Sequence, residues 1–208
     1  MYEILCFGDS NTWGWIPGSG ERYPFEKRWT GVLQKELGKG FHIIEEGLNG
    51  RTTLLDDPIE FNRNGLKYLV PCLESHKPLD LVVLLLGSND LKARFSVTAF
   101  DIALSVGVLI DVIKRSESGR GNRAPEVLLL APPPLGDLTD FAELFEGGRE
   151  KSQKLGNYYR SIAEERESYF LDLGDIVSPS DIDGVHFSEE SHRIVGKKVA
   201  ETIGKIIL

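Results

Sequence analysis

The residue types that could carry out acyl chemistry lie near the two ends of this 208-residue chain. Ser10 follows an apolar run at residues 4–8, and its polar neighbours Asp9 and Asn11 are typical of a turn that opens a helix. We therefore predict a buried strand that stops at Gly8 and presents Ser10 at the carboxyl edge of a sheet, where open parallel sheets bind ligands. A serine in such a turn is most often only a cap, so its role depends on the far end of the chain.

At the far end, Asp183 and His186 are three residues apart in a predicted strand-to-helix loop. An imidazole can take the proton of a serine hydroxyl, and a carboxylate can orient that imidazole. Of the other histidines, His42 lies in a predicted strand and His76 at a helix end. His192 lies inside the last helix, where a solvated or capping role is expected. Three more aspartates lie close by, so the residues alone leave the orienting carboxylate open (Asp172, Asp175 and Asp181).

Four segments resemble, in order and context, the blocks of the SGNH (GDSL-like) hydrolases: GDSN at 8–11, Gly50, GSND at 87–90 and DGVH at 183–186. The longer strings GDSNTWGW and LLLGSNDLK resemble the arylesterase/acyltransferase branch of that superfamily. The resemblance spans nearly the whole chain. Asn11 departs from it, because the motif that names the family has leucine there. We expect little effect, since the nucleophile is the preceding residue.

The resemblance implies a serine esterase that cleaves small acyl or aryl esters through an acyl-enzyme. Its catalytic residues are then Ser10 as nucleophile, His186 as base and Asp183 as the carboxylate that orients the base. The oxyanion hole is expected from the Ser10 N–H, Gly50 and the Asn89 side chain, because free backbone N–H groups and an uncharged amide can stabilise an oxyanion.

The resemblance also implies that Trp13 lines the substrate pocket. It further implies acyl transfer to alcohols or peroxide, and a homo-oligomer, for which 51–78 and 132–150 are candidate contact segments. The aromatic segment 141–145 could cover the entrance of the site or contact another subunit. No cofactor and no metal are expected.

The amino-acid composition indicates which kinds of partner the protein can bind and which cellular compartment suits it. The net charge of −8, from 24 basic and 32 acidic residues, disfavours nucleic acid and anionic membranes as partners. Cys6 and Cys72 both lie among apolar residues, so we predict buried thiols in a reducing compartment. No run approaches the ~20 apolar residues of a membrane span, and the amino terminus lacks a basic segment followed by an apolar one. A cytoplasmic protein is expected, with a small-molecule ester as its substrate.

Strand and helix patterns alternate along the chain, which predicts right-handed crossovers and a parallel sheet. We predict strands near 4–8, 41–44, 79–86, 126–131 and 169–173, and helices near 28–37, 65–76, 98–115 and 188–207. A short helix within 135–150 is expected to lead into a longer one that ends near Arg166. The predicted fold is α/β, a single three-layer α/β/α domain over residues 1–208 with five parallel strands in the order 2-1-3-4-5.

Two rival functions belong to other classes. Asp9, Asp181 and Asp183 could bind magnesium in a phosphatase-like site, because strand-end carboxylates are suitable ligands. A flavodoxin-like binding module for a nucleotide or flavin is the non-enzymatic alternative. Against the latter, the chain has neither a GxxxxGK[ST] loop nor a GxGxxG after a strand.

Overall fold

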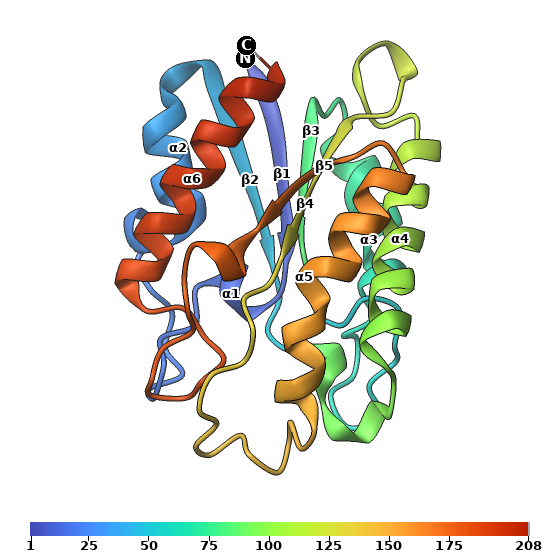
Figure 1. The fold of residues 1–208 in the computed structure, drawn as a ribbon. Helices are drawn as coiled ribbons and strands as arrows, with labels where there is room; N and C mark the ends of the chain where they lie inside the picture. Colours follow the sequence, from blue (N-terminus) through green and yellow to red (C-terminus); the bar gives the residue numbers. More distant parts are fainter. Residues whose placement is uncertain (208) are drawn as a thin grey trace.

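In the computed structural model, which describes residues 1–207, five strands form one parallel sheet. The strands are β1 (Tyr2–Gly8), β2 (Phe41–Gly47), β3 (Leu81–Leu85), β4 (Glu126–Ala131) and β5 (Tyr169–Asp172). Their order across the sheet is β2-β1-β3-β4-β5, and every neighbouring pair is parallel (Figure 1). The predicted α/β fold with strand order 2-1-3-4-5 is confirmed.

Helices cover both faces of the sheet (Figure 1). One face carries α2 (Trp29–Leu37) and α6 (Glu189–Ile207), and the other carries α3 (Gly65–His76), α4 (Ala99–Arg115) and α5 (Gly148–Glu165). The central strands bury side chains in both layers because successive residues of a strand point to opposite faces. In β1, Leu5 and Phe7 pack with the second group of helices, whereas Ile4 and Cys6 pack with the first.

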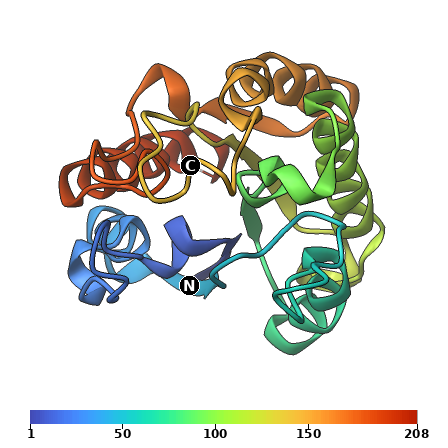
Figure 2. The same cartoon turned by 90° about the horizontal axis from the view of Figure 1, so that it is seen from below.

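The carboxyl edge of the sheet gathers the segments that carry the motifs. The short helix α1 (Ser10–Trp13) begins directly after β1, and the loops after β2 and β3 start at the same edge. Figure 2 looks onto this edge and shows that the loops that lead into α5 and α6 also run across it. The parallel topology therefore brings residues from both ends of the sequence to one place.

The segment before α5 differs from the prediction. Residues 135–147 form turns without an α-helix, and α5 begins at Gly148, after Gly147 with a φ of +70°. Some backbone hydrogen bonds of this segment are local, such as Phe145 N–H to Phe141 O at 3.0 Å, and others reach another loop: Gly136 N–H donates to Gly184 O at 2.8 Å, and the side-chain Thr139 Oγ1 donates to Ile182 O at 2.9 Å. These contacts fix the segment to the loop that contains His186, which a helix would not do.

His192 is fully buried rather than solvated, and it takes the capping role that was the other expectation for it. Its Nδ1 accepts a hydrogen bond at 3.2 Å from the backbone N–H of Trp29, at the start of α2. Burial, with smaller effects of Arg28 and His186, lowers the pKa of His192 to about 3, so the ring stays neutral and joins α6 to α2.

Cys6 and Cys72 are free and buried, as the sequence predicts. Within residues 1–207, every helix is too short or too polar to cross a membrane.

Candidate active site

Ser10 is the first residue of α1 and is only 6% exposed. Asp9 caps the helix, because its Oδ1 accepts a hydrogen bond from Asn11 N at 2.9 Å. Gly8 makes the sharp turn possible: a Cβ there would lie 2.1 Å from Thr12 Oγ1 and 2.9 Å from Leu85 O. The local sequence thus forces the chain from a buried strand into a helix within two residues and leaves the hydroxyl at the sheet edge.

His186 lies against Ser10, although 176 residues separate them in the chain. The distance from Ser10 Oγ to His186 Nε2 is 3.0 Å, and that from His186 Nδ1 to Asp183 Oδ2 is 2.8 Å. A carboxylate can only accept, so Nδ1 carries the proton and Nε2 is free to accept the hydroxyl proton of Ser10. All three side chains are buried. This arrangement can activate a serine hydroxyl.

Two backbone N–H groups fix the position of the Asp183 carboxylate. Its Oδ1 accepts hydrogen bonds from the backbone N–H groups of Val185 at 3.0 Å and His186 at 2.9 Å. Burial alone would raise the pKa of Asp183, but the hydrogen bonds from the His186 side chain and these two N–H groups outweigh it and lower the pKa. The carboxylate is therefore ionised at neutral pH and can stabilise an imidazolium beside it.

The alternative carboxylates do not contact His186. Asp175 and Asp181 are exposed, and Asp172 instead accepts from Gly174 N–H at 2.9 Å.

Among residues 1–207, one group of three side chains brings metal-ligand atoms together, and none of its members lines the cavity at Ser10. The group consists of Glu46, Cys72 and His76. The carboxylates proposed for a magnesium site, Asp9, Asp181 and Asp183, do not form such a group in this part of the chain.

The three residues expected in an oxyanion hole line one cavity together with His186. Within residues 1–207, neither the Ser10 N–H nor the Gly50 N–H has a hydrogen-bond partner, whereas Asn89 Nδ2 donates to Arg51 O at 3.2 Å. Gly50 has a φ of +78°, and a Cβ there would lie 2.3 Å from Glu60 Oε2. Glycine is favoured at this position by the positive φ, and any larger residue would also have to displace the Glu60 carboxylate.

An aromatic wall closes one side of this cavity. The Trp15 ring stacks on the His186 ring with centroids 5.2 Å apart, and Phe141 meets the same imidazole edge-on at 5.9 Å. Phe145 completes the wall, so the segment 141–145 covers the site. Trp13, which we predict in the substrate pocket, is not among the residues that line this cavity; its ring lies under Arg22, 5.0 Å from the guanidinium carbon, and its centroid is 6.2 Å from that of Trp15. The second tryptophan of the motif, Trp15, takes that place.

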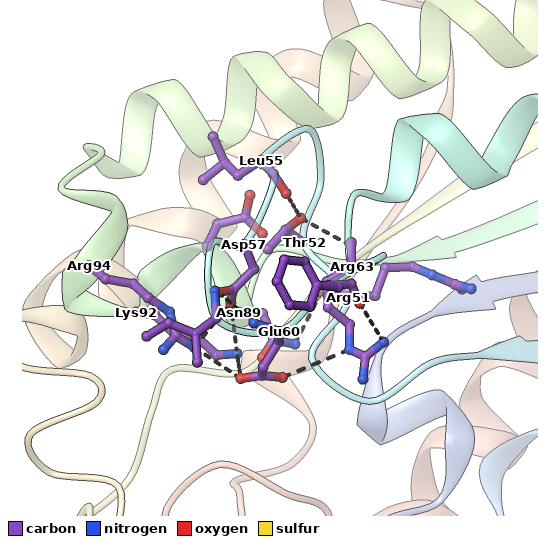
Figure 3. Close-up of polar contacts among 12 residues, drawn as sticks. Arg51, Thr52, Leu55, Asp57, Glu60, Arg63, Asn89, Lys92 and Arg94 are labelled. Carbon is purple, nitrogen blue, oxygen red and sulfur yellow. Dashed lines mark hydrogen bonds and ion pairs between the residues drawn. The ribbon is translucent and has the colours of Figure 1, made fainter.

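The same cavity has a charged wall to which the sequence did not point, and its ion pairs are drawn in Figure 3. Glu60 Oε1 lies 2.8 Å from Lys92 Nζ and 2.9 Å from an Arg94 nitrogen, and Asp57 lies 3.0 Å from Arg94. Glu60 also faces Arg63 at 3.9 Å. The Lys92 side chain is only 3% exposed, and both Lys92 and Glu60 line the cavity. One wall can thus exchange hydrogen bonds with a polar substrate.

Two buried carboxyl groups lie behind the site. Asp90 accepts hydrogen bonds from Thr53 N–H with both oxygens, at 3.1 and 3.0 Å. Burial raises the pKa of Asp90 to about 7 and that of Asp9 to about 6, although hydrogen bonds to both groups oppose the rise. Both groups hold turns of the site loops, as expected from the sequence.

The cavity at Ser10 has a volume of about 180 Å³. A larger hollow of about 590 Å³ is lined by polar and charged residues such as Arg51, Lys67 and Tyr68, but it includes none of Ser10, Asn89 and His186. The smaller cavity is therefore the candidate active site.

Comparisons with known proteins identify the family of this chain. The family described as GDSL-like Lipase/Acylhydrolase matches residues 6–194. Est24, a carbohydrate acetylesterase from Sinorhizobium meliloti, is 44% identical over 100% of both chains, with a TM-score of 0.97. The native aryl esterase of M. smegmatis is 43% identical over 100% of both chains, with a TM-score of 0.96.

A more distant structure shares the fold. It is a member of the lipolytic protein G-D-S-L family from Veillonella parvula DSM 2008, 14% identical over 99% of this chain and 100% of that one, with a TM-score of 0.72. No match is found among curated protein sequences. The family match covers most of the chain and the similar esterases align along its full length; this protein is therefore an esterase of the GDSL-like lipase/acylhydrolase family.

Proposed function

We propose that this esterase cleaves small acyl and aryl esters by covalent catalysis at Ser10. The observation that carries the proposal is the continuous hydrogen-bonded series from Ser10 Oγ through His186 to Asp183, at 3.0 and 2.8 Å. A serine hydroxyl is a weak nucleophile at its ordinary acidity, so a base within hydrogen-bond distance is what makes it reactive. Nothing else that lines the cavity supplies such a base to Ser10.

In the first half of the reaction, Ser10 Oγ attacks the ester carbonyl and its proton passes to His186 Nε2. The imidazolium that forms is stabilised by the Asp183 carboxylate through Nδ1–H. The negative carbonyl oxygen accepts hydrogen bonds from the N–H groups of Ser10 and Gly50 and from Asn89 Nδ2. The carbon–oxygen bond to the alcohol then breaks, and the alcohol leaves with the proton from Nε2.

In the second half, water reaches the acyl group on Ser10. His186 Nε2 takes a proton from the water as its oxygen attacks the carbonyl, and the same oxyanion donors stabilise the intermediate. The bond to Ser10 Oγ breaks, the carboxylic acid leaves, and Oγ regains the proton. Each proton taken by the imidazole is returned, so the enzyme ends in its starting state.

An initial burst tests the two-step scheme. With p-nitrophenyl acetate, rapid mixing should release about one p-nitrophenol per Ser10 before the steady state, provided that deacylation is slower than acylation. Ser10→Ala should remove both burst and turnover. Ser118→Ala is the matched control, because Ser118 is equally buried but its backbone contacts Leu79 near the amino edge of the sheet. Full turnover in the Ser10→Ala protein would refute the proposal.

The cavity supports a preference for short acyl groups. Its volume is about 180 Å³, comparable to the ~150 Å³ that holds a benzene molecule, so it has room for a short acyl chain but not for a long one. The M. smegmatis relative is an aryl esterase and the S. meliloti relative is a carbohydrate acetylesterase, so both aryl acetates and acetylated polyols are candidate substrates. A series of p-nitrophenyl esters should show kcat/KM falling as the acyl chain lengthens beyond four carbons.

Acyl transfer to an alcohol is a second proposed activity. The aromatic contacts of Trp15 and Phe141 with His186 support it, because an apolar surround next to the acyl group favours an alcohol over water. With p-nitrophenyl acetate and ethanol in water, the ratio of ethyl acetate to acetate should exceed the molar ratio of ethanol to water. A product ratio equal to that molar ratio would leave hydrolysis as the only function.

We also propose that copies of the chain associate through the segment 51–78. Its support is a group of exposed apolar side chains, among them Ile59 at 66%, Phe61 at 75% and Val70 at 51%. Light scattering should give a mass of at least two chains, and Phe61→Lys should lower it.

A cytoplasmic location is proposed on the free thiols Cys6 and Cys72, which suit a reducing compartment.

A further inference from the structure

Asn11 contacts the backbone on both sides of His186. Its side chain is 3% exposed and follows Ser10 directly in α1. Asn11 Nδ2 donates to Val185 O at 3.3 Å, and Asn11 Oδ1 accepts from Phe187 N–H at 2.8 Å. One amide therefore bridges the residue before the proposed base and the residue after it.

Only one orientation of the amide satisfies these contacts. The Phe187 N–H can only donate and the Val185 carbonyl can only accept, so the amide oxygen must face Phe187 and the nitrogen must face Val185. Within residues 1–207, neither backbone group has another hydrogen-bond partner. The leucine that the family-naming motif carries at this position could make neither contact, so the role of Asn11 follows from this chain's own residue.

Two other contacts reach His186 from α1 and the turn after it, the Ser10 Oγ–Nε2 hydrogen bond and the stacked Trp15 ring, but both touch only the imidazole and not the backbone of its loop. Asp183 holds the ring and the His186 N–H, and Ser180 N–H donates to His186 O at 2.8 Å, but both lie in the same loop as His186. Asn11 joins that loop to α1. Because Ser10 and Asn11 are adjacent, the bridge sets the position of the imidazole relative to the Ser10 hydroxyl.

We infer that Asn11 is a positioning residue that holds the His186 loop on α1 and so maintains the distance between Ser10 Oγ and His186 Nε2. The inference rests on the proposed roles of Ser10 and His186. Asn11 should also affect deacylation, which is the second half of the reaction. Once Ser10 is acylated, Oγ has no proton to donate to Nε2, and the Asn11 bridge remains between the two segments. Deacylation should therefore depend on Asn11 at least as strongly as acylation does.

The experiment compares Asn11→Leu and Asn11→Ser with the wild-type protein. Leucine keeps the size of the side chain without its polar atoms, whereas serine is polar but too short to bridge both backbone groups. Gln34→Leu is the matched control: Gln34 also bridges two segments, donating to Phe41 O and accepting from Ile43 N–H, both at 3.0 Å, but it joins α2 to β2. Each variant is assayed for kcat, KM, burst amplitude and melting temperature.

Both Asn11 variants should lower kcat by roughly 10- to 100-fold with KM within about 2-fold of wild type, because small displacements of a catalytic group cost rate rather than affinity. Gln34→Leu should lower the melting temperature and leave kcat unchanged. In a His186→Ala background, Asn11→Leu should cause no further loss, since the residue acts through the imidazole.

Two kinetic results would overturn the inference: wild-type kcat in both Asn11 variants, or a higher KM with unchanged kcat. It is also overturned if Asn11→Leu lowers kcat in the His186→Ala background as much as it does in the wild type, or if both variants fail to fold. The proposed function fails separately. It fails if His186→Ala alone retains wild-type turnover, whereas an inactive His186→Ala protein beside a fully active Asn11→Leu protein refutes only the role of Asn11.

Discussion

Asp183 divides its two carboxylate oxygens between the backbone and the ring of His186: Oδ1 accepts from the His186 N–H at 2.9 Å, and Oδ2 contacts Nδ1 at 2.8 Å. The same side chain therefore fixes the position of the residue and the tautomer of its imidazole. This division predicts the effect of replacing one oxygen by nitrogen.

Asp183→Asn should lower kcat by roughly 10³- to 10⁴-fold at neutral pH with a small change in KM. The two backbone N–H groups at Oδ1 require an oxygen, so the amide nitrogen would face Nδ1. Nδ1 would then have to accept, and Nε2 would carry the proton and could not take one from Ser10. Asp181→Asn, in the same loop but exposed, is the control and should stay within 2-fold. Comparable losses in both variants would contradict this account.

Asn89→Ala should lower kcat by roughly 10²- to 10³-fold, because the amide is proposed to bind the oxyanion only as charge develops. KM should change by less than about 3-fold. The exposed Asn157 on α5 offers a matched Asn→Ala control that should leave both parameters unchanged. A rise in KM without a fall in kcat would assign Asn89 to ground-state binding instead.

Phe141→Ala should widen the range of accepted acyl chains. Phe141 meets His186 edge-on and lines the cavity, so its loss enlarges the space beside the acyl group. The ratio of kcat/KM for p-nitrophenyl octanoate to that for p-nitrophenyl acetate should rise by about 10-fold, which corresponds to burial of about two further methylenes at ~0.8 kcal/mol each. Phe100→Ala, a change to an exposed phenylalanine on α4, should leave the ratio unchanged. An unaltered ratio in the Phe141 variant would remove the proposed role of the aromatic wall.

Asp90 should make the protein less stable as the pH rises. Its pKa is about 7 in the folded protein, against ~3.9 in an unfolded chain. The unfolded chain therefore loses its proton first, so the free energy of unfolding falls between about pH 4 and pH 7 and then levels. Asp9, with a pKa of about 6, acts in the same direction. His192 acts in the opposite direction, because its lowered pKa costs stability as the pH falls below about 6.5.

Asp90→Asn isolates one of these contributions. The amide oxygen can still accept from Thr53, but the side chain no longer titrates. Measured by urea denaturation, the free energy of unfolding of the wild type minus that of Asp90→Asn should decrease by a few kcal/mol from pH 4 to pH 8. A difference that stays constant over this range would show that Asp90 is already ionised at low pH.

The sequence predicted the sheet, and it predicted that Ser10, Asp183 and His186 would meet at its edge, because both depend on strong local patterns. The apolar run before Gly8 and the continuous run at 79–86 identify buried strands, and parallel topology then places their carboxyl ends at one edge. The resemblance to the SGNH hydrolases, which the family match confirms, selected Asp183 among several nearby aspartates. The structure then places Asp183 alone of these on His186.

The remaining features depend on tertiary contacts that no local pattern encodes. Trp13 and Trp15 look equivalent in sequence, and only the turn after α1 decides that Trp15 stacks on His186. The aromatic and glycine content of 135–150 suggested a short helix before the longer one, but the segment up to Gly147 forms only turns, and Gly136 and Thr139 bond to the loop before His186. Asn11 looked like a substitution without effect, since its partners lie 174 and 176 residues away.

The charged wall was missed for the same reason. Glu60 and Lys92 are 32 residues apart and resemble ordinary surface charges in the sequence. In the fold, the loop after β2 and the turns after β3 meet and bury the Lys92 side chain between carboxylates (Figure 3). A buried lysine is not predictable from the type of residue alone, because lysine is buried only when paired.

The central claim is that Ser10 is the nucleophile activated by His186, and covalent labelling tests it most directly. The intact protein is treated with a fluorophosphonate, digested and analysed by mass spectrometry, with His186→Ala treated in parallel. The account predicts one phosphonyl group per chain on Ser10, loss of esterase activity in proportion to labelling, and labelling at least 100-fold slower in His186→Ala. Labelling at another residue, or full esterase activity in a protein fully labelled at Ser10, would contradict it.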